Sequence, residues 1–458
     1  MAYKNLDVLS CPLPEDIRRV IDHGDLKLAG HLIDLRLKDA KVPLVMKERL
    51  LFEKRILKEL PSVYPMNTEE ALLRFNSVLD GFTLEELESY RDDGTCDWVY
   101  IDGEPHYHED CVDTVLKTRP ELTARIKDRG LIALNQGHQS ALDEMMKDMK
   151  KSRGAVWRFR LKTTVSLKEE AQRIGERIRV YLPLPVSDAQ CCAGKIRISS
   201  PDQAFIATEN TPQRTACWNV TYEKDMVFAT DAEWIIRAPY TALNPDDVSI
   251  EQPTFYTEEI LPQIVFTPFI RQLAAELAGD IKNPLLKARR YYDYITTRCS
   301  YRFVPPYAFK TCIPEYFGTG QRGDCGMHAL LFIALCRVSG IPARWQAGLY
   351  TPPWGPGMHD WARFYIAPYG WLYADASFGG SAFRAGNKER WDFYFGSIDP
   401  WRVVYNSALQ QDFDPPKKYL RYDPYDNQSA EIEYEDRGLL RSEFKVKREL
   451  LTCEKVKN

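Results

Sequence analysis

The sequence has no long apolar run, no clear excess of charge of either sign and no internal repeat. Its longest unbroken apolar segment, Ala329–Cys336, has eight residues, whereas a membrane-spanning helix needs about 18 or more. The 61 basic and 65 acidic residues give a net charge of −4, so no basic surface for nucleic acid or anionic lipid is indicated. We therefore expect neither nucleic acid nor a membrane as a partner.

The first residues lack an apolar core of the kind found in secretory signals. The cysteines number 11, an odd count, and are spread from Cys11 to Cys453. This distribution favours reduced thiols over a disulfide framework. Together, these features predict a cytoplasmic protein.

What is present is an ordinary globular composition, with 44% hydrophobic and 28% charged residues in a chain of 458. At about 100–200 residues per domain, this length suits two to four domains. Apolar residues recur at helical spacing through residues 1–152, which predicts a mostly helical domain. Short alternating runs over residues 155–240 predict an antiparallel β-sandwich. Residues 263–458 are the third predicted domain, and the expected fold class is α+β with several domains.

The most informative segment is Gly323–His328, where a thiol flanked by glycines, Cys325, directly precedes an apolar helical run. We expect this helix to stop at Ser339-Gly340, because glycine commonly ends helices. Cys325 then lies in the first helical turn, where unpaired N–H groups and the helix dipole favour a thiolate. The thiolate is the reactive form of a cysteine nucleophile.

Two further residues complete a possible nucleophilic site. His359 opens one expected strand and Asp375 ends the next. A Cys, a His and an Asp can serve as nucleophile, general base and the carboxylate that orients the base. A tight turn at Pro368-Tyr369 would place Asp375 opposite Ala362, on the order of 10 Å from His359 along the strand. The site therefore requires a bulge, a wider turn or strong twist between the strands.

Four motifs follow one another along the chain. They are Gly323-Asp324-Cys325-Gly326, Gly340-Ile341-Pro342-Ala343-Arg344, His359-Asp360-Trp361, and Gly370-Trp371 followed by Asp375. From Tyr292 to about Ser377 this series resembles the core of the transglutaminase-like superfamily. The resemblance implies a papain-like α+β fold, with a helix packed against an antiparallel sheet. It also implies that Cys325 is the nucleophile, His359 the base and Asp375 the third member of a catalytic triad.

Neighbouring residues have competing explanations. His328, one helical turn from Cys325, is a rival base, although a packing role is favoured. Trp361 is more often a core residue than part of a substrate cleft, whereas Trp354, in a Pro/Gly loop, suits a cleft rim or a loop anchor. Gln321 could donate to an oxyanion beside the Cys325 N–H. Trp354, Trp361 and Gln321 are the candidate substrate-cleft residues.

A second cluster consists of Cys96, His106, His108 and Cys111, which could supply four zinc ligands. Their spacing matches no zinc module that we can cite, and their acidic neighbours suit a solvated loop equally well. We therefore expect no metal and no cofactor.

The sequence thus predicts a cysteine-dependent amide hydrolase, a peptidase or deamidase, that acts on peptides or proteins through a thioester acyl-enzyme. The resemblance also permits protein crosslinking, but no site for an acceptor amine is evident, so we rank hydrolysis above transfer. The other alternative is a non-catalytic protein-interaction module on the same scaffold. In that case Cys325 would be a buried structural thiol.

Overall fold

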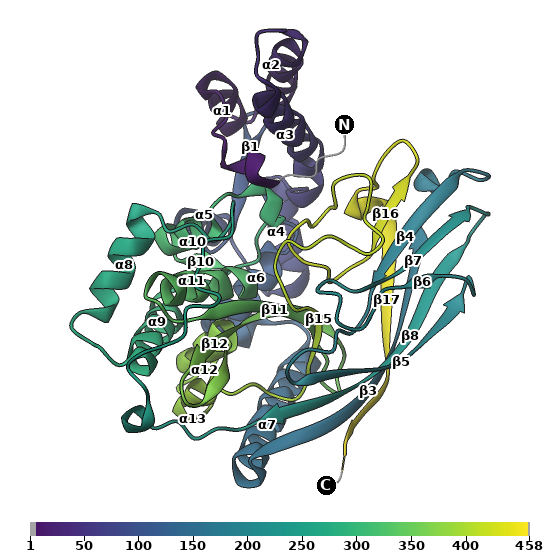
Figure 1. Cartoon of the computed structure of the whole chain (residues 1–458). Coiled ribbons are helices and arrows are strands. Elements are labelled where there is room, and N and C mark those ends of the chain that lie inside the picture. Colours follow the sequence, from purple (N-terminus) through teal and green to yellow (C-terminus); the bar gives the residue numbers. More distant parts are fainter. Residues whose placement is uncertain (1–5, 457–458) are drawn as a thin grey trace.

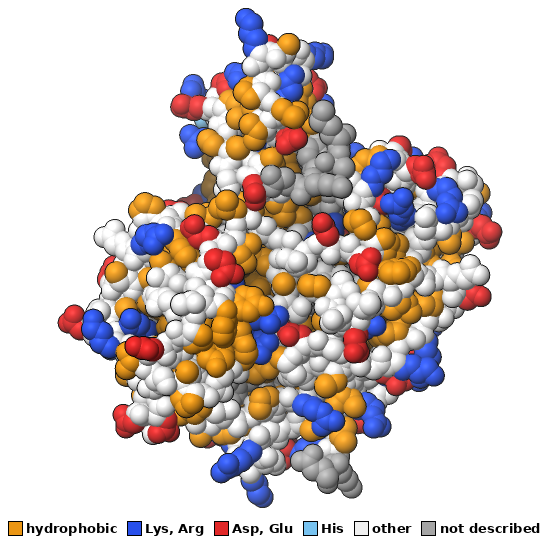
Figure 2. All heavy atoms as spheres, viewed as in Figure 1, with side chains coloured by type: hydrophobic (Ala, Val, Ile, Leu, Met, Phe, Trp, Pro, Cys, Tyr) orange, Lys and Arg blue, Asp and Glu red, His pale blue; other side chains and the backbone are white. Residues whose placement is uncertain are grey.

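A computed structural model describes residues 6–456, and helices and sheets are both prominent in it (Figure 1). This mixture agrees with the expected α+β class. Most helices gather on one side of the molecule and two large sheets on the other (Figure 1). Acidic and basic side chains are interspersed over the face in Figure 2. Within residues 6–456, no helix combines the length and the apolar character needed to cross a membrane.

The N-terminal part is mostly helical. Asn67 and Thr83 begin two of its helices through capping boxes, in which each side chain accepts a backbone N–H and a glutamate reaches back. The short apolar stretch Trp98–Ile101 forms a hairpin with the strand that contains His106. The elements are α1 (Glu15–Asp22), α2 (Leu26–Lys38), α3 (Leu44–Val63), α4 (Thr68–Val78), α5 (Leu84–Asp92), β1 (Trp98–Ile101), β2 (Glu104–Tyr107), α6 (Cys111–Thr118) and α7 (Arg129–Ser152).

Two four-stranded antiparallel sheets follow, and buried side chains of both meet in one core. Other buried residues of the first sheet, such as Phe159 and Trp234, pack in the larger core that also contains α11. The first has the order β17-β3-β8-β5 and the second β16-β4-β7-β6. Their strands are β3 (Gly154–Leu167), β4 (Arg177–Pro183), β5 (Cys191–Ser200), β6 (Phe205–Ile206), β7 (Thr215–Thr221), β8 (Val227–Pro239), β16 (Glu431–Tyr434) and β17 (Phe444–Lys455).

Strands β16 and β17 come from the segment that the sequence pattern groups with the third domain, residues 263–458. β17 pairs along β3, and β16 pairs with β4. The two sheets therefore use strands from outside the predicted range 155–240. Alternation along a strand indicates which face is buried, but it does not identify the partner strand.

The remaining part combines helices with a five-stranded sheet of order β14-β13-β12-β11-β15. Its elements are α8 (Pro268–Ala278), α9 (Pro284–Arg298), β9 (Ser300–Tyr301), α10 (Ile313–Gly320), β10 (Arg322–Gly323), α11 (Cys325–Val338), β11 (Ala343–Tyr350), β12 (Gly357–Ile366), β13 (Gly370–Ala374), α12 (Ala376–Arg384), α13 (Lys388–Phe393), β14 (Phe395–Gly396) and β15 (Arg402–Asn406). Short 3-10 helices span Leu6–Ser10, Pro120–Arg125, Glu169–Ala171, Pro245–Asp247, Tyr307–Phe309 and Arg441–Glu443.

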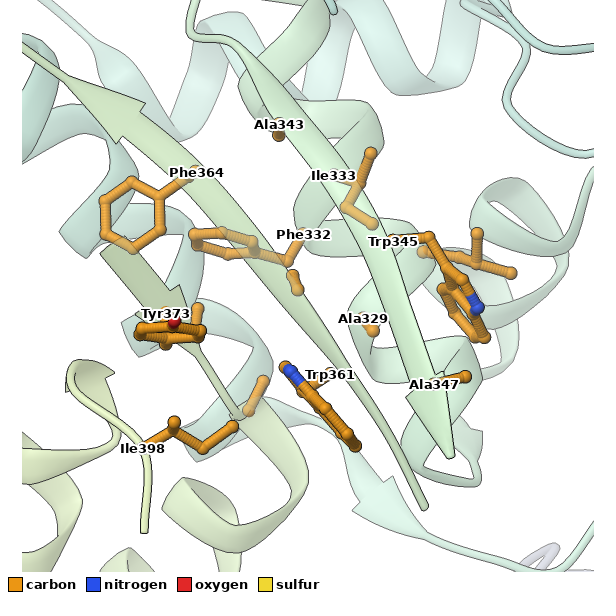
Figure 3. Packing of buried hydrophobic residues seen from close by; sticks show 14 of the residues in the cluster. Ala329, Phe332, Ile333, Ala343, Trp345, Ala347, Trp361, Phe364, Tyr373 and Ile398 are labelled. Atoms are coloured by element: carbon orange, nitrogen blue, oxygen red, sulfur yellow. The ribbon is translucent and has the colours of Figure 1, made fainter. Parts of the chain in front are cut away.

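Helix α11 is buried along nearly its whole length. Ala329, Phe332 and Ile333 of this helix pack against strands β11 and β12 (Figure 3). Phe332 meets the ring of Phe364 at a centroid distance of 5.4 Å. The helix ends before Ser339, as the glycine stop predicted. Its deep packing fixes the first turn, and thus Cys325, relative to the sheet.

Candidate active site

Cys325 is the first residue of α11 and is 8% exposed. The side chain of Asp324 caps the helix by accepting the Met327 N–H at 3.1 Å, and the Tyr307 hydroxyl donates to the same oxygen at 2.7 Å. The thiol therefore stands where the sequence predicted it, at a capped helix start. A Cβ atom at Gly326 would lie 1.9 Å from the Tyr307 hydroxyl oxygen, which explains the glycine beside the thiol.

His359 and Asp375 are brought together. The Nε2–H of His359 donates to Oδ2 of Asp375 at 2.8 Å, and both side chains are buried. Pairing of β12 with β13 sets Ala362 opposite Ala374, so the register differs by one residue from the predicted pairing of Ala362 with Asp375. Asp375 lies just beyond the strand, where it caps α12 by accepting the Phe378 N–H. This departure from the strand carries the carboxylate to His359, and no bulge is needed between the paired residues of these strands.

Arg402 of β15 forms an ion pair with Asp375 of the His359–Asp375 pair. Its side chain is fully buried, at 0% exposure, and Nη1 lies 2.8 Å from Oδ2 of Asp375. Burial opposes the charge on Asp375, but His359 and Arg402 outweigh burial and hold the pKa of this carboxyl well below its usual range. Burial also lowers the pKa of His359, against the opposing effect of Asp375. The result favours an ionised Asp375 beside a neutral imidazole.

The sulfur of Cys325 makes its polar contact with Asp360, the residue after His359. Sγ donates to Oδ2 of Asp360 at 3.5 Å. Among the hydrogen bonds of residues 6–456, none joins Cys325 to His359. Burial raises the pKa of the Cys325 thiol well above its usual range, and the charges of Asp360 and Asp324 add to this rise. Burial and the two acids therefore oppose the thiolate that the helix start was expected to favour.

The C-terminal segment before β16 closes over this contact. Gln428 donates through Nε2 to Oδ1 of Asp360 at 2.6 Å and to the His359 carbonyl at 3.0 Å. Asp423 of the same segment acts on Asp360 through its charge, and the Asp426 side chain is a hydrogen-bond partner of Asp360. Apart from the adjacency of Asp360 to His359, no feature of the sequence indicated these residues or Arg402.

The subsidiary site residues have other partners. Trp361 is 0% exposed and donates to Gln346 at 2.7 Å, which supports the core role over the candidate cleft role. The amide of Gln321 donates to Tyr294 at 3.1 Å, and the described contacts do not join it to the sulfur. Trp354 is half-buried and stacks on His138 of α7 at 4.1 Å, which supports the loop-anchor role.

His328 is buried within α11 and donates through Nδ1 to the Asp324 carbonyl at 2.7 Å. Its ring lies 4.6 Å from that of Phe317. Burial lowers the pKa of His328 to about 4. These contacts agree with a packing role rather than with a base for Cys325.

The second candidate cluster is divided among different contacts. Cys96 and Cys111 contact each other within an apolar core. His106 contacts the Tyr64 carbonyl, and His108 accepts the Asp110 N–H. In the described part of the chain, no group of three or more His, Cys, Asp or Glu side chains is arranged to hold a metal ion.

The comparisons bear on the core of this site. A family model described as the transglutaminase-like superfamily matches residues 271–376. Among solved structures, a candidate cysteine protease from Cytophaga hutchinsonii is 15% identical, with 67% of this chain and 92% of that chain covered and a TM-score of 0.40. The periplasmic domain of TgpA from Pseudomonas aeruginosa is 13% identical, with 54% and 94% covered and a TM-score of 0.28. The curated proteins gave no match.

The matched segment begins in α8 and ends at the start of α12, so it contains the thiol, the imidazole and the carboxylate described above. It also contains the four motifs on which the resemblance rested. Residues 271–376 are thus similar to the transglutaminase-like superfamily, over less than half of the chain.

Proposed function

We propose that this chain is a cysteine-dependent amide hydrolase, of the peptidase or deamidase type, that acts on peptides or proteins. The observation that carries the proposal is the buried His359–Asp375 pair, in which Nε2 lies 2.8 Å from Oδ2. The residue next to His359, Asp360, contacts the Cys325 sulfur. The match of residues 271–376 to the superfamily model supports the same assignment. Cytoplasmic residence belongs to the proposal as well, and the 11 free cysteines of the structure are compatible with it.

In the proposed reaction, Cys325 supplies the nucleophile. Because Nε2 of His359 is held by Asp375, Nδ1 is the ring nitrogen left to accept the thiol proton. The sulfur then bonds to the amide carbon, and the backbone N–H of Cys325 is available to the oxyanion. Collapse of this intermediate breaks the C–N bond, and the proton on Nδ1 passes to the departing amine or ammonia. Water, deprotonated by His359, then hydrolyses the thioester.

Hydrolysis is preferred to crosslinking because transfer needs an amine that competes with water, and no acceptor site is apparent from the sequence. The non-catalytic module is favoured by one observation, the burial of the thiol at 8% exposure beside two acids. The experiment must therefore separate an enzyme with a covered thiol from a scaffold with an inert one.

The test measures release of peptides and of ammonia from denatured casein, with dansyl-cadaverine incorporation as the assay for transfer. Proteins with Cys325→Ala, His359→Ala and Asp375→Asn are compared with the unmodified chain. Cys192→Ala, which removes an exposed thiol on β5, is the matched control and keeps full turnover. Loss of at least about a thousandfold in the three site variants supports hydrolysis. Equal turnover in the unmodified chain and Cys325→Ala contradicts it, and cadaverine incorporation without hydrolysis would favour transfer.

A further inference from the structure

Asp360 contacts the reacting sulfur, although the triad does not include it. We propose that Asp360 is a further catalytic residue: its carboxyl holds Cys325 as a neutral thiol before substrate binds, and Gln428 orients that carboxyl. The inference rests on the proposed function, because it takes Cys325 as the nucleophile.

The geometry gives each carboxylate oxygen its own partner. Oδ2 of Asp360 accepts from Sγ of Cys325 at 3.5 Å, while Oδ1 accepts from Nε2 of Gln428 at 2.6 Å. Gln428 is itself held, since its carbonyl accepts from Arg448 of β17 at 2.6 Å. A carboxyl fixed at both oxygens has one rotamer available, and that rotamer faces the thiol. Gln428 is therefore a positioning residue that acts through Asp360.

The surroundings of the sulfur discourage a second negative charge. Asp324 approaches from the start of α11 and Asp375 from just beyond β13, while Tyr301 approaches from β9 and Tyr307 from the 3-10 helix before α10. Asp423 and Asp426 approach Asp360 from the C-terminal segment. Lys117 of α6 is a cation that acts on the sulfur. With several buried acids around the thiol, a proton shared between Sγ and Asp360 is favoured over two adjacent anions.

This contact determines when the nucleophile becomes reactive. A neutral thiol is a poor nucleophile and is slow to alkylate or oxidise. Transfer of its proton to His359 requires that the hydrogen bond to Asp360 be broken. Any substrate group that displaces the Asp360 carboxyl therefore frees the thiol proton for the base, so activation is tied to occupation of the site.

The experiment follows alkylation of Cys325 by iodoacetamide, measured by peptide mass spectrometry across about pH 5 to 10. In Asp360→Asn, which keeps the shape of the side chain, the midpoint of the profile falls by at least about one pH unit, and alkylation near pH 7 becomes about tenfold faster. Gln428→Leu shifts the midpoint in the same direction by a smaller amount. Asp423→Asn is the matched control, because Asp423 acts on Asp360 through charge alone and does not contact the sulfur, and it gives a smaller shift than Asp360→Asn.

A midpoint in Asp360→Asn equal to that of the unmodified chain overturns the inference. If His359→Ala raises the midpoint of the alkylation profile, the proposed function survives that result. If casein hydrolysis is absent and His359→Ala leaves the profile unchanged, the proposed function itself fails.

A second measurement does not depend on folding of the Asp360 variant. The infrared difference spectrum between the unmodified chain and Cys325→Ala isolates the S–H stretching band of Cys325. A band displaced to low frequency, as for a thiol that donates a hydrogen bond to a carboxyl group, supports the contact. A band at the position of a free thiol contradicts it.

Discussion

Arg402 and Asp375 form an ion pair from which water is excluded, with Nη1 of the arginine 2.8 Å from Oδ2 of the aspartate. The same Oδ2 accepts the Nε2–H of His359 at 2.8 Å. Asp399 holds the other side of the guanidinium through Nε and Nη2, at 2.8 and 2.6 Å. Because arginine keeps its charge at any ordinary pH, Asp375 stays ionised and the imidazole keeps a fixed acceptor.

Removal of this arginine is expected to affect stability and activity together. Arg402→Leu leaves two buried carboxylates without their cation, and such a loss costs about 3–5 kcal/mol. Urea unfolding measures the free energy, and casein hydrolysis measures turnover. Arg158→Leu is the control, because its pair with Glu454 is exposed on both sides and is expected to contribute less than about 1 kcal/mol. Equal losses in the two variants would contradict the prediction.

Asp324 is expected to make the protein less stable as pH rises from about 4 to about 6. Burial raises the pKa of Asp324 to about 6, although hydrogen bonds from Tyr307 and the Met327 N–H oppose the rise. The folded state therefore holds this proton more tightly than the unfolded state. The stability it confers is complete below the ordinary carboxyl pKa and is lost as pH passes the folded value, to a limit of about 3 kcal/mol.

Asp324→Asn checks this, because asparagine caps helices as well as aspartate does. Urea unfolding is measured at several pH values. Between pH 4 and pH 6, the free energy of unfolding of the variant should rise relative to that of the unmodified chain. A constant difference between the two proteins would show that Asp324 does not titrate as proposed.

His328 is expected to have the opposite effect, making the protein less stable as pH falls. Burial lowers the pKa of His328 to about 4, so the unfolded state binds a proton that the folded state rejects. Its contribution is present above the ordinary histidine pKa of about 6.5 and is lost as pH falls toward 4, by about 3 kcal/mol. His328→Asn should remove this loss while keeping a donor for the Asp324 carbonyl, as followed by thermal unfolding from pH 7 to pH 4. Parallel curves for the variant and the unmodified chain would refute the assignment.

Gly326 is expected to tolerate no side chain. An alanine Cβ there would lie 1.9 Å from the Tyr307 hydroxyl oxygen and 2.8 Å from Oδ2 of Asp360. We expect Gly326→Ala to lose about 1–3 kcal/mol of stability and to alter alkylation of the adjacent thiol. Gly320→Ala is the matched control in α10, because no atom lies within 4 Å of its added Cβ. Adding Tyr307→Phe to Gly326→Ala should restore part of the loss, and no restoration would mean that the clash lies elsewhere.

Local chemistry explains why some of this site was predictable. The glycines around Cys325, the apolar run after it and the stop at Ser339-Gly340 predicted α11 from short-range rules, and the structure confirms that helix. The near approach of His359 to Asp375 was also expected, although the register differed by one residue. The family match over residues 271–376 agrees with the resemblance that those motifs suggested.

Long-range packing explains what was missed. Arg402 and Gln428 come far after Asp375 in the chain, and nothing in the residues around either of them marks a partner. The helix dipole at Cys325 predicted a thiolate, but the dipole is a local effect. The balance is decided by burial and by Asp360 and Asp324, and burial becomes known only from the folded structure.

The pairing of β17 with β3 has a consequence for how the chain is made. β3 pairs with β8 along one edge, and its other edge stays unpaired until residues 444–455 have been synthesised and form β17. During translation that edge is a long strand with unsatisfied backbone groups, a template for unwanted pairing with other nascent chains. Gln428 is synthesised in the same late interval, so the ribosome has nearly completed the described chain before the thiol acquires its restraint.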